Sequence, residues 1–236
     1  MTRLSERSLT EKSLAELQGI SVSNYNRKNI RPGALHIGVG NFHRGHQAVY
    51  FDDLLESDSQ WGIVGVSMRS GGTRDRMAPQ DHLYTVCEKN DNESSYRIIG
   101  SILEVLVLAE SRQKILNLGA SSYISCITLT VTENGYCHTN SGDLNWQHPE
   151  VTHDSENPDS PISVPGLHVS LLDARMRADG GPINLLSCDN LILSGALSVS
   201  VCVAEVPVIG WHRRIISTPC ARKMATRAAI GSLARY

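Results

Sequence analysis

The chain has 236 residues, of which 41% are hydrophobic and 19% charged, with 19 glycines and 9 prolines. This composition supports one large domain or two small ones with a buried core, and it excludes disordered and collagen-like chains. Lys and Arg together number 22 and Asp and Glu number 24, so the formal net charge is -2. No overall basic field therefore favours nucleic acid or an anionic membrane as a partner.

Neither end of the chain predicts a membrane segment or an export signal. The most apolar late stretch, residues 195–211, is interrupted by Glu205 and Pro207, well short of the roughly 18 apolar residues that a spanning helix needs. The N-terminus alternates charged with single apolar residues and lacks the apolar core of a secretory signal. The six cysteines form no C-x-x-C pair, which favours buried reduced thiols. We expect a cytoplasmic protein.

The first strong pattern is a strand, a tight turn and a helix. An apolar run over residues 34–40 ends in two closely spaced glycines, Gly38 and Gly40. Residues 42–55 then place their apolar side chains on one helical face. A second β-branched run, residues 61–66, follows about 20 residues later, which is the spacing of a βαβ crossover. The unit has the size of a mononucleotide-binding half.

Shorter patterns continue the alternation of strands and helices. Strands are predicted at 84–87, within 97–107, at 124–131 and at 183–188, and helices at 8–17, 74–77, 111–118 and 167–177. Residues 143–165 are polar and punctuated by prolines, which predicts a long irregular connection over the surface. The alternation favours a layered α/β sheet.

The end of the chain differs in charge from the rest. Residues 191–236 carry six Lys and Arg against one acid, so 6 minus 1 gives +5 there and leaves -7 for residues 1–190. Such an asymmetry indicates a tail or a change of module. This stretch lacks the interleaved aromatic residues and the motifs of nucleic-acid binding, so no nucleic acid is expected as a partner.

The two glycines have a physical use at a strand-to-helix turn. Without side chains they let backbone approach a pyrophosphate, but His43 stands at the third position of the usual G-x-G-x-x-G pattern. Spacing alone therefore also allows a tight structural turn. His43 and His46 have the i, i+3 spacing of a metal pair, yet no nearby residue completes the ligand set. We expect no metal site.

Longer words of the sequence resemble the polyol-specific long-chain dehydrogenases, the family of mannitol 2-dehydrogenase, fructuronate reductase and tagaturonate reductase. The words are HIGVGNFHRGHQAVYFDDLL, WGIVGVSMR, QDHLYTVCEK, RIIGSI, TLTVTENGY and LLSCDNL. The resemblance covers roughly residues 22–191 and implies a Rossmann-type α/β fold, a mostly parallel sheet with flanking helices. It also implies NAD as cofactor and hydride transfer between a polyol and its ketose. Cys137, which follows E-x-G-Y, favours a mannitol 2-dehydrogenase-like enzyme.

Two alternatives stay open beside this function. One is a fructuronate or tagaturonate reductase-like enzyme, and the other is a non-catalytic remnant that binds a nucleotide without turnover.

The resemblance further implies roles for single residues. The cofactor-binding turn comprises Gly38, Val39, Gly40, Asn41, Phe42 and His43. Arg69 is expected beside the adenosine ribose, and the strand end that lines the nicotinamide comprises Thr130, Thr132 and Glu133. Asn190 is expected to hold the substrate oxygen through its amide N–H. As structural alternatives, Glu133 can bind loop backbone, and Asp189 with Asn190 can cap a turn.

After LLSCDNL the sequence departs from the family. The family continues into a mainly helical domain whose K-x-x-x-x-N-x-x-H motif carries the catalytic base, whereas Lys223 is the only later lysine here and Ala228 replaces the Asn. We therefore divide the chain into an N-terminal extension (1–29), a Rossmann-type domain (30–190) and an aberrant or truncated, poorly ordered tail (191–236). The base is then absent, and the chain alone is expected to be inactive and monomeric, with a polyol or ketose as the family's substrate.

The stretch after Arg69 bears on the choice of cofactor. An acidic residue about 20 residues beyond the glycine turn usually binds the ribose hydroxyls and selects NAD. Here the first acid is Asp75, preceded by Arg74. We expect NAD as the main cofactor, with NADP tolerated.

Overall fold

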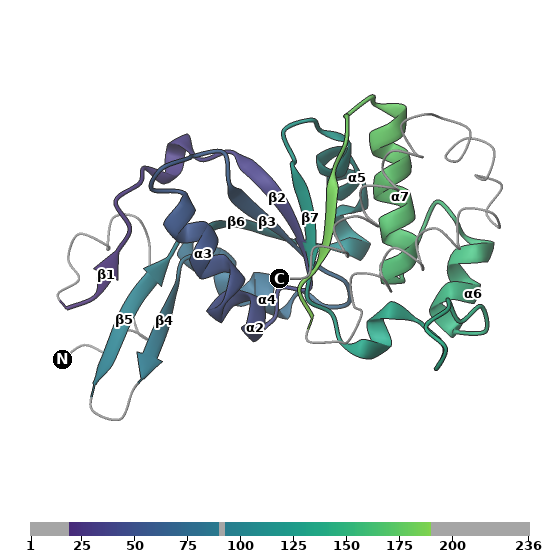
Figure 1. Ribbon diagram of the computed structural model, residues 1–236, viewed down its shortest axis with the longest axis horizontal. Helices are drawn as coiled ribbons and strands as arrows, with labels where there is room; N and C mark the ends of the chain where they lie inside the picture. Colours follow the sequence, from purple (N-terminus) through teal and green to yellow (C-terminus); the bar gives the residue numbers. More distant parts are fainter. Residues whose placement is uncertain (1–18, 90–92, 190–236) are drawn as a thin grey trace. The chain divides into compact units, whose positions relative to one another are not determined.

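The computed structural model describes residues 19–89 and 93–189. The described residues divide into two compact units, with the boundary between residues 107 and 108 (Figure 1). The helix predicted at residues 8–17, Asn190 and the tail 191–236 lie outside the described residues.

Parallel strands form the main sheet of the first unit. They are β2 (Pro32–Ile37), β3 (Gly62–Ser67) and β6 (Ile102–Val107), with β3 between the other two. Leu35 and Val66 in this sheet are fully buried. Continuous apolar strands of this kind need helices over both faces, as the predicted α/β layering requires.

Two helices connect β2 to β3, where the sequence predicts a single helix over residues 42–55. They are α2 (Asn41–Gly45) and α3 (Gln47–Leu54). The backbone leaves the helical region at His46, with φ -131° and ψ -85°. The prediction of one continuous helix is therefore wrong at this point, because the apolar spacing that predicts a helix does not report a single non-helical residue within it.

A hairpin extends from the first unit (Figure 1). Its strands β4 (Tyr84–Lys89) and β5 (Ser94–Ile99) are antiparallel, and β1 (Ser21–Val22) pairs with β5 in parallel. The sequence predicts strand within 97–107, and the structure divides this range between β5 and β6. The Gly100 N–H donates to the Asp52 carboxylate at 2.8 Å, so this N–H is not used to pair with a neighbouring strand.

Short helical elements complete the first unit. They are η2 (Arg27–Asn29), α4 (Gly72–Met77) and η3 (Ala78–Gln80). Of these, α4 agrees with the helix predicted at residues 74–77 and packs against β6.

The second unit contains two parallel strands and two long helices that lie side by side (Figure 1). The strands are β7 (Cys126–Leu129) and β8 (Asn184–Ser187), and the helices are α5 (Leu108–Ala120) and α7 (Val164–Arg177). Gly119 permits this close packing, because a Cβ there would lie 2.4 Å from Leu171 Cδ2. All four elements agree in type with the sequence prediction.

The proline-punctuated stretch is more ordered than predicted. It contains α6 (Pro149–Glu156), so the expectation of an irregular surface connection over residues 143–165 is wrong in part. Pro149 occupies the first helical turn, where its missing N–H costs nothing and its fixed φ favours the helix. Asp154, only 4% exposed, accepts the backbone N–H groups of Ile162 and Ser163 and so holds the chain that follows α6.

No helix among residues 19–89 and 93–189 has the length and apolar character needed to cross a membrane.

Candidate functional site

Gly38 and Gly40 shape the turn between β2 and α2. Gly38 has φ +96°, which glycine adopts without strain, and its N–H donates to the Val66 carbonyl at 2.9 Å. Gly40 has φ -85°, and a Cβ there would meet only the Gly38 carbonyl oxygen, at 3.9 Å. Local packing therefore does not require glycine at position 40. Its missing side chain leaves the backbone open to a ligand.

The residue between the two glycines anchors the turn on the sheet. Val39 is 5% exposed, and a Cβ on Gly65 of β3 would lie 2.4 Å from Val39 Cγ2. The isopropyl group of Val39 thus takes the space left by Gly65, which keeps the turn close to the strand.

Two stacked histidines lie beneath the turn. The rings of His36 and His43 have centroids 3.4 Å apart and an interplanar angle of 11°. His36 Nε2 donates to the Gly38 carbonyl at 3.1 Å, and His43 Nδ1 donates to Gln47 Oε1 at 3.0 Å. Burial lowers the pKa of His43 to about 4 and that of His36 well below its usual range. Both rings are therefore neutral at pH 7 and stack without charge repulsion.

The Arg44 guanidinium stabilises the same turn. Arg44 donates to the Val39 carbonyl at 3.0 Å and to the Asn41 side-chain oxygen. The Tyr84 hydroxyl donates to the Arg44 carbonyl at 2.8 Å, which ties β4 to α2. The sequence assigns no role to Tyr84, although it lies within the word QDHLYTVCEK.

Phe42 and Arg69, two other predicted cofactor residues of the first unit, are exposed. Phe42 is 56% exposed and stacks on His46 at a centroid distance of 5.1 Å. Arg69 follows the end of β3 by two residues. Asp75 lies in α4 and accepts the Arg74 guanidinium at 2.9 Å.

The predicted nicotinamide residues follow β7 in the second unit. Thr130 is half-buried, whereas Thr132 and Glu133 are exposed at the start of η4 (Glu133–Tyr136). The structure thus places the turn residues and Arg69 in one unit, and these three residues in the other.

A buried hydroxyl and a carboxylate join the ends of β7 and β8. Asp189 Oδ2 accepts the Val131 N–H at 3.0 Å and the Tyr136 hydroxyl at 2.6 Å. Tyr136 also shares a 2.5 Å hydrogen bond with the Ser187 hydroxyl. Asp189 therefore binds the backbone that follows β7. The alternative that Asp189 and Asn190 cap a turn stays a prediction, since Asn190 lies outside the described residues. Tyr136 is missed by the sequence analysis, although it belongs to the word TLTVTENGY.

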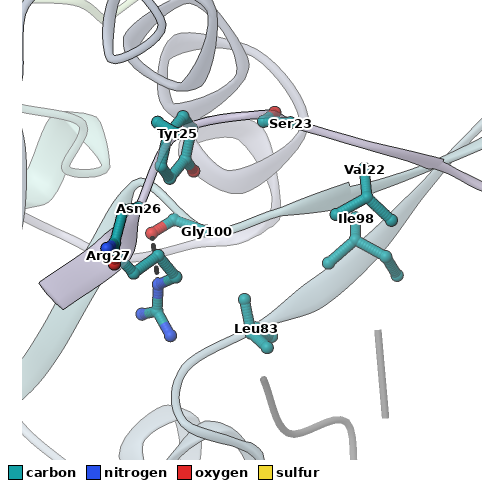
Figure 2. A pocket seen from close by; sticks show the side chains of 8 residues that line it. All are labelled: Val22, Ser23, Tyr25, Asn26, Arg27, Leu83, Ile98 and Gly100. Atoms are coloured by element: carbon teal, nitrogen blue, oxygen red, sulfur yellow. Dashed lines mark hydrogen bonds between the residues drawn. The ribbon is translucent and has the colours of Figure 1, made fainter. Parts of the chain in front are cut away.

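A cavity of about 200 Å³ lies elsewhere in the first unit (Figure 2). Its lining includes Tyr25, Leu83 and Ile98, together with Arg27, which donates to the Gly100 carbonyl at 3.1 Å. None of the predicted site residues lines it.

Comparison with protein families identifies the chain. The Rossmann domain of mannitol dehydrogenase matches residues 32–221. The chain belongs to the mannitol dehydrogenase family. The family inferred from the sequence words is thereby confirmed. The match ends beyond residue 191, where the recognised words end, and the division of the chain at residue 190 stays a prediction.

Individual relatives agree with this membership. The chain is 35% identical to mannitol 2-dehydrogenase of Pyrenophora tritici-repentis over 201 residues, which cover 83% of this chain and 36% of the relative. It is 37% identical to D-mannonate oxidoreductase of Escherichia coli over 203 residues, which cover 79% of this chain and 40% of the relative.

A solved member of the mannitol dehydrogenase family has the same fold. Pseudomonas fluorescens mannitol 2-dehydrogenase, in a ternary complex with NAD and D-mannitol, matches with a TM-score of 0.83 and 35% identity. The match covers 89% of this chain and 44% of that protein. The predicted Rossmann-type fold with a mostly parallel sheet is confirmed. This chain spans 35% to 44% of the length of the first relatives.

Proposed function

We propose that the chain binds NAD at the turn between β2 and α2, as the cofactor-binding part of a polyol oxidoreductase of the mannitol 2-dehydrogenase type. The observation that carries the proposal concerns Gly40. No neighbouring atom requires a glycine there, and the missing side chain leaves its backbone open to a ligand. In a Rossmann domain the second glycine of the turn lets backbone approach the pyrophosphate. The related Pseudomonas fluorescens enzyme was solved with NAD.

The turn offers suitable partners for a pyrophosphate. The N–H groups of Asn41 and Phe42 begin α2 and have no acceptor within the helix. Arg44 adds a positive charge that is held by the Val39 carbonyl. Because α2 has only five residues, we attribute affinity to these groups and to close approach rather than to a helix dipole.

Residues near the reacting atoms would orient the substrate. When bound, NAD would supply the acceptor for the hydride from the polyol C–H; loss of the alcohol proton as well would give a ketose and NADH. We propose that Thr130, Thr132 and Glu133 contact the nicotinamide and that the Asn190 amide donates to the substrate oxygen, where negative charge develops. No residue of the chain is proposed as the base. A monomer in the cytoplasm stays our expectation.

A sugar-acid substrate is the second candidate. The identity of 37% to D-mannonate oxidoreductase favours it as much as the mannitol 2-dehydrogenases favour a polyol. Both candidates use the same cofactor turn, so they differ in the substrate rather than in NAD binding.

Calorimetric titration of the full chain with NAD tests the proposal. Gly40→Ala should fold normally, since its Cβ has room, but the new methyl group would lie against the pyrophosphate. We expect Kd to rise at least about tenfold, or ~1.4 kcal/mol. Gly45→Ala is the matched control, because a Cβ there meets nothing within 4 Å, and it should bind NAD like the parent. Unchanged affinity in a folded Gly40→Ala variant would refute the assignment.

We also predict that the chain alone turns over neither mannitol nor mannonate. Losing a positioned base removes a factor of about 10² to 10⁴ in rate, and the substrate pocket requires more residues than the cofactor turn. NADH formation should be measured with purified chain at saturating NAD and each substrate. Sustained turnover of either substrate would show that the chain carries its own base, and would select between the two candidates.

A further inference from the structure

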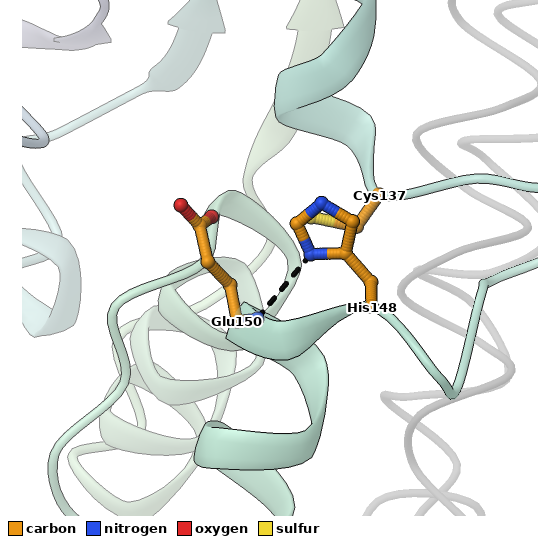
Figure 3. Close-up of side chains that lie close together, drawn as sticks. All are labelled: Cys137, His148 and Glu150. Carbon is orange, nitrogen blue, oxygen red and sulfur yellow. Dashed lines mark hydrogen bonds between the residues drawn. The ribbon is translucent and has the colours of Figure 1, made fainter.

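Three metal-ligating side chains meet in the second unit, outside the predicted cofactor residues. They are Cys137 at the end of η4, His148 just before α6, and Glu150 in the first turn of α6 (Figure 3). One ligand atom from each, a sulfur, a ring nitrogen and a carboxylate oxygen, lies within 4.8 Å of the other two.

The loop between Cys137 and His148 is closed by its own hydrogen bonds. The Asn145 N–H donates to the Cys137 carbonyl at 2.7 Å, and the His148 N–H donates to the Asn145 carbonyl at 2.9 Å. An isolated antiparallel bridge joins His138 to Leu144. The backbone of one compact loop thus holds Cys137 and His148 close together.

The surroundings suit a half-enclosed ion. Cys137 is 2% exposed and packs with the buried residues Leu144 and Val151, whereas His148 and Glu150 are half-buried. The sulfur therefore lies on the dry side, and water can reach the other two donors. A thiolate, an imidazole and a carboxylate form a ligand set for zinc, whereas magnesium and calcium prefer oxygen alone.

We propose that Cys137, His148 and Glu150 bind a zinc-class divalent ion, with water as the fourth ligand. On a tetrahedral zinc, bond lengths of 2.0 to 2.3 Å place ligand atoms about 3.3 to 3.5 Å apart. The donors, which lie within 4.8 Å of one another, must therefore approach by up to about 1.5 Å. Rotation of the half-buried His148 and Glu150 side chains can supply this approach. The site departs from the sequence expectation of no metal.

Binding has costs at two of the ligands. The Cys137 thiol would lose its weak contacts with the Asn134 and Gly135 carbonyls, at 3.9 and 3.7 Å. His148 would lose a hydrogen bond. Its Nδ1 accepts the Glu150 N–H at 3.3 Å, a long hydrogen bond that caps α6. Coordination through Nδ1 would use the same lone pair, and coordination through Nε2 would move the ring proton to Nδ1, facing that N–H. Either way the cap is exchanged for a metal bond. Amide hydrogen exchange at Glu150 should therefore accelerate when the metal binds.

Titration of the chelator-treated full chain with Zn²⁺ and Co²⁺ tests the site. We expect about one ion per chain at this site, with a thiolate-to-cobalt charge-transfer band. Cys137→Ser should lose the band and weaken Zn²⁺ binding by at least about tenfold. Cys126→Ser, at a buried thiol of β7, is the matched control and should keep both the band and the affinity.

Glu150→Gln provides a second variant if Cys137→Ser fails to fold. It keeps the backbone N–H that His148 caps and removes the ligand charge, so it should keep the cobalt band and weaken Zn²⁺ binding about tenfold. Absence of Zn²⁺ binding in the parent chain would overturn the proposal. So would a cobalt complex without a thiolate band, or equal affinity in the parent and both ligand variants.

Discussion

Histidine burial is the main chemical feature at the scale of single residues. His36 and His43 lie beneath the glycine turn, and His168 lies inside α7 at 2% exposure. Burial lowers the pKa of His43 and of His168 to about 4. A neutral imidazole is the form that a dry interior tolerates, because the charged form loses its hydration there.

These histidines should make the chain less stable in acid. Their pKa values in the folded chain lie below the unfolded value of 6.5, so the unfolded chain binds more protons. The free energy of unfolding is therefore fully retained above pH 6.5 and falls as the pH decreases from 6.5 toward 4. Each histidine contributes a slope of up to about 1.4 kcal/mol per pH unit.

Replacing one buried histidine isolates this contribution. His168→Leu should reduce the change in unfolding free energy per pH unit by the equivalent of about one bound proton. Urea unfolding at several pH values between 7 and 5 measures this slope. His46→Gln changes an exposed histidine and serves as the control. Parallel slopes for the parent and His168→Leu would contradict the assignment.

At the scale of elements, one carboxylate joins α3 to the segments around it. Asp52 is fully buried and accepts four groups: the hydroxyls of Ser23 and Tyr25, the Arg97 guanidinium at 2.7 Å and the Gly100 N–H at 2.8 Å. Burial and the charge of Asp52 raise the pKa of Tyr25, so its phenol stays protonated and remains a donor. This cluster fixes the chain before β2 and the junction of β5 with β6.

Neutralising Asp52 should loosen these elements. Asp52→Asn replaces one of the two acceptor oxygens with an NH₂ donor and leaves Arg97 to pair with the exposed Asp53. We expect a loss of about 2 to 4 kcal/mol in the free energy of unfolding. The neighbouring Asp53 also pairs with Arg97, but its side chain is 56% exposed, so Asp53→Asn should cost less than about 1 kcal/mol. Urea unfolding of both variants measures the difference. Similar losses would show that burial of Asp52 is not the cause.

At the scale of the whole molecule, the charged residues after β3 bear on the choice between NAD and NADP. Arg69 and Arg74 precede Asp75, the first acid after β3, and Asp75 is paired with Arg74. A 2′-phosphate would meet weaker repulsion here than at a site with an unpaired acid. We therefore expect NADP to bind measurably, with NAD still preferred.

Titration of the parent chain with both cofactors measures this preference. The affinities should differ by less than about a hundredfold, or ~2.7 kcal/mol. Asp75→Asn should strengthen NADP binding and leave NAD affinity unchanged, so the difference between the two affinities should become smaller. A larger preference for NAD in the parent would mean that an acid reaches the ribose hydroxyls.

The sequence alone determined the family, the order of most strands and the position of the glycine turn. These features depend on local chemistry: apolar runs predict buried strands, and Gly38 adopts a positive φ that other residues avoid. The words around them were specific enough to identify the Rossmann domain that the family comparison confirms. The cofactor residues named from those words remain predictions.

Only the tertiary structure decided those features that depend on contacts between residues distant in the sequence. Gly100 ends β5 by donating to Asp52, 48 residues away in the sequence. The stacking of His36 on His43 and the meeting of Cys137 with His148 likewise depend on how turns fold back. Local propensity does not specify such pairings, because their free energy comes from burial and hydrogen bonds that exist only once the chain has packed.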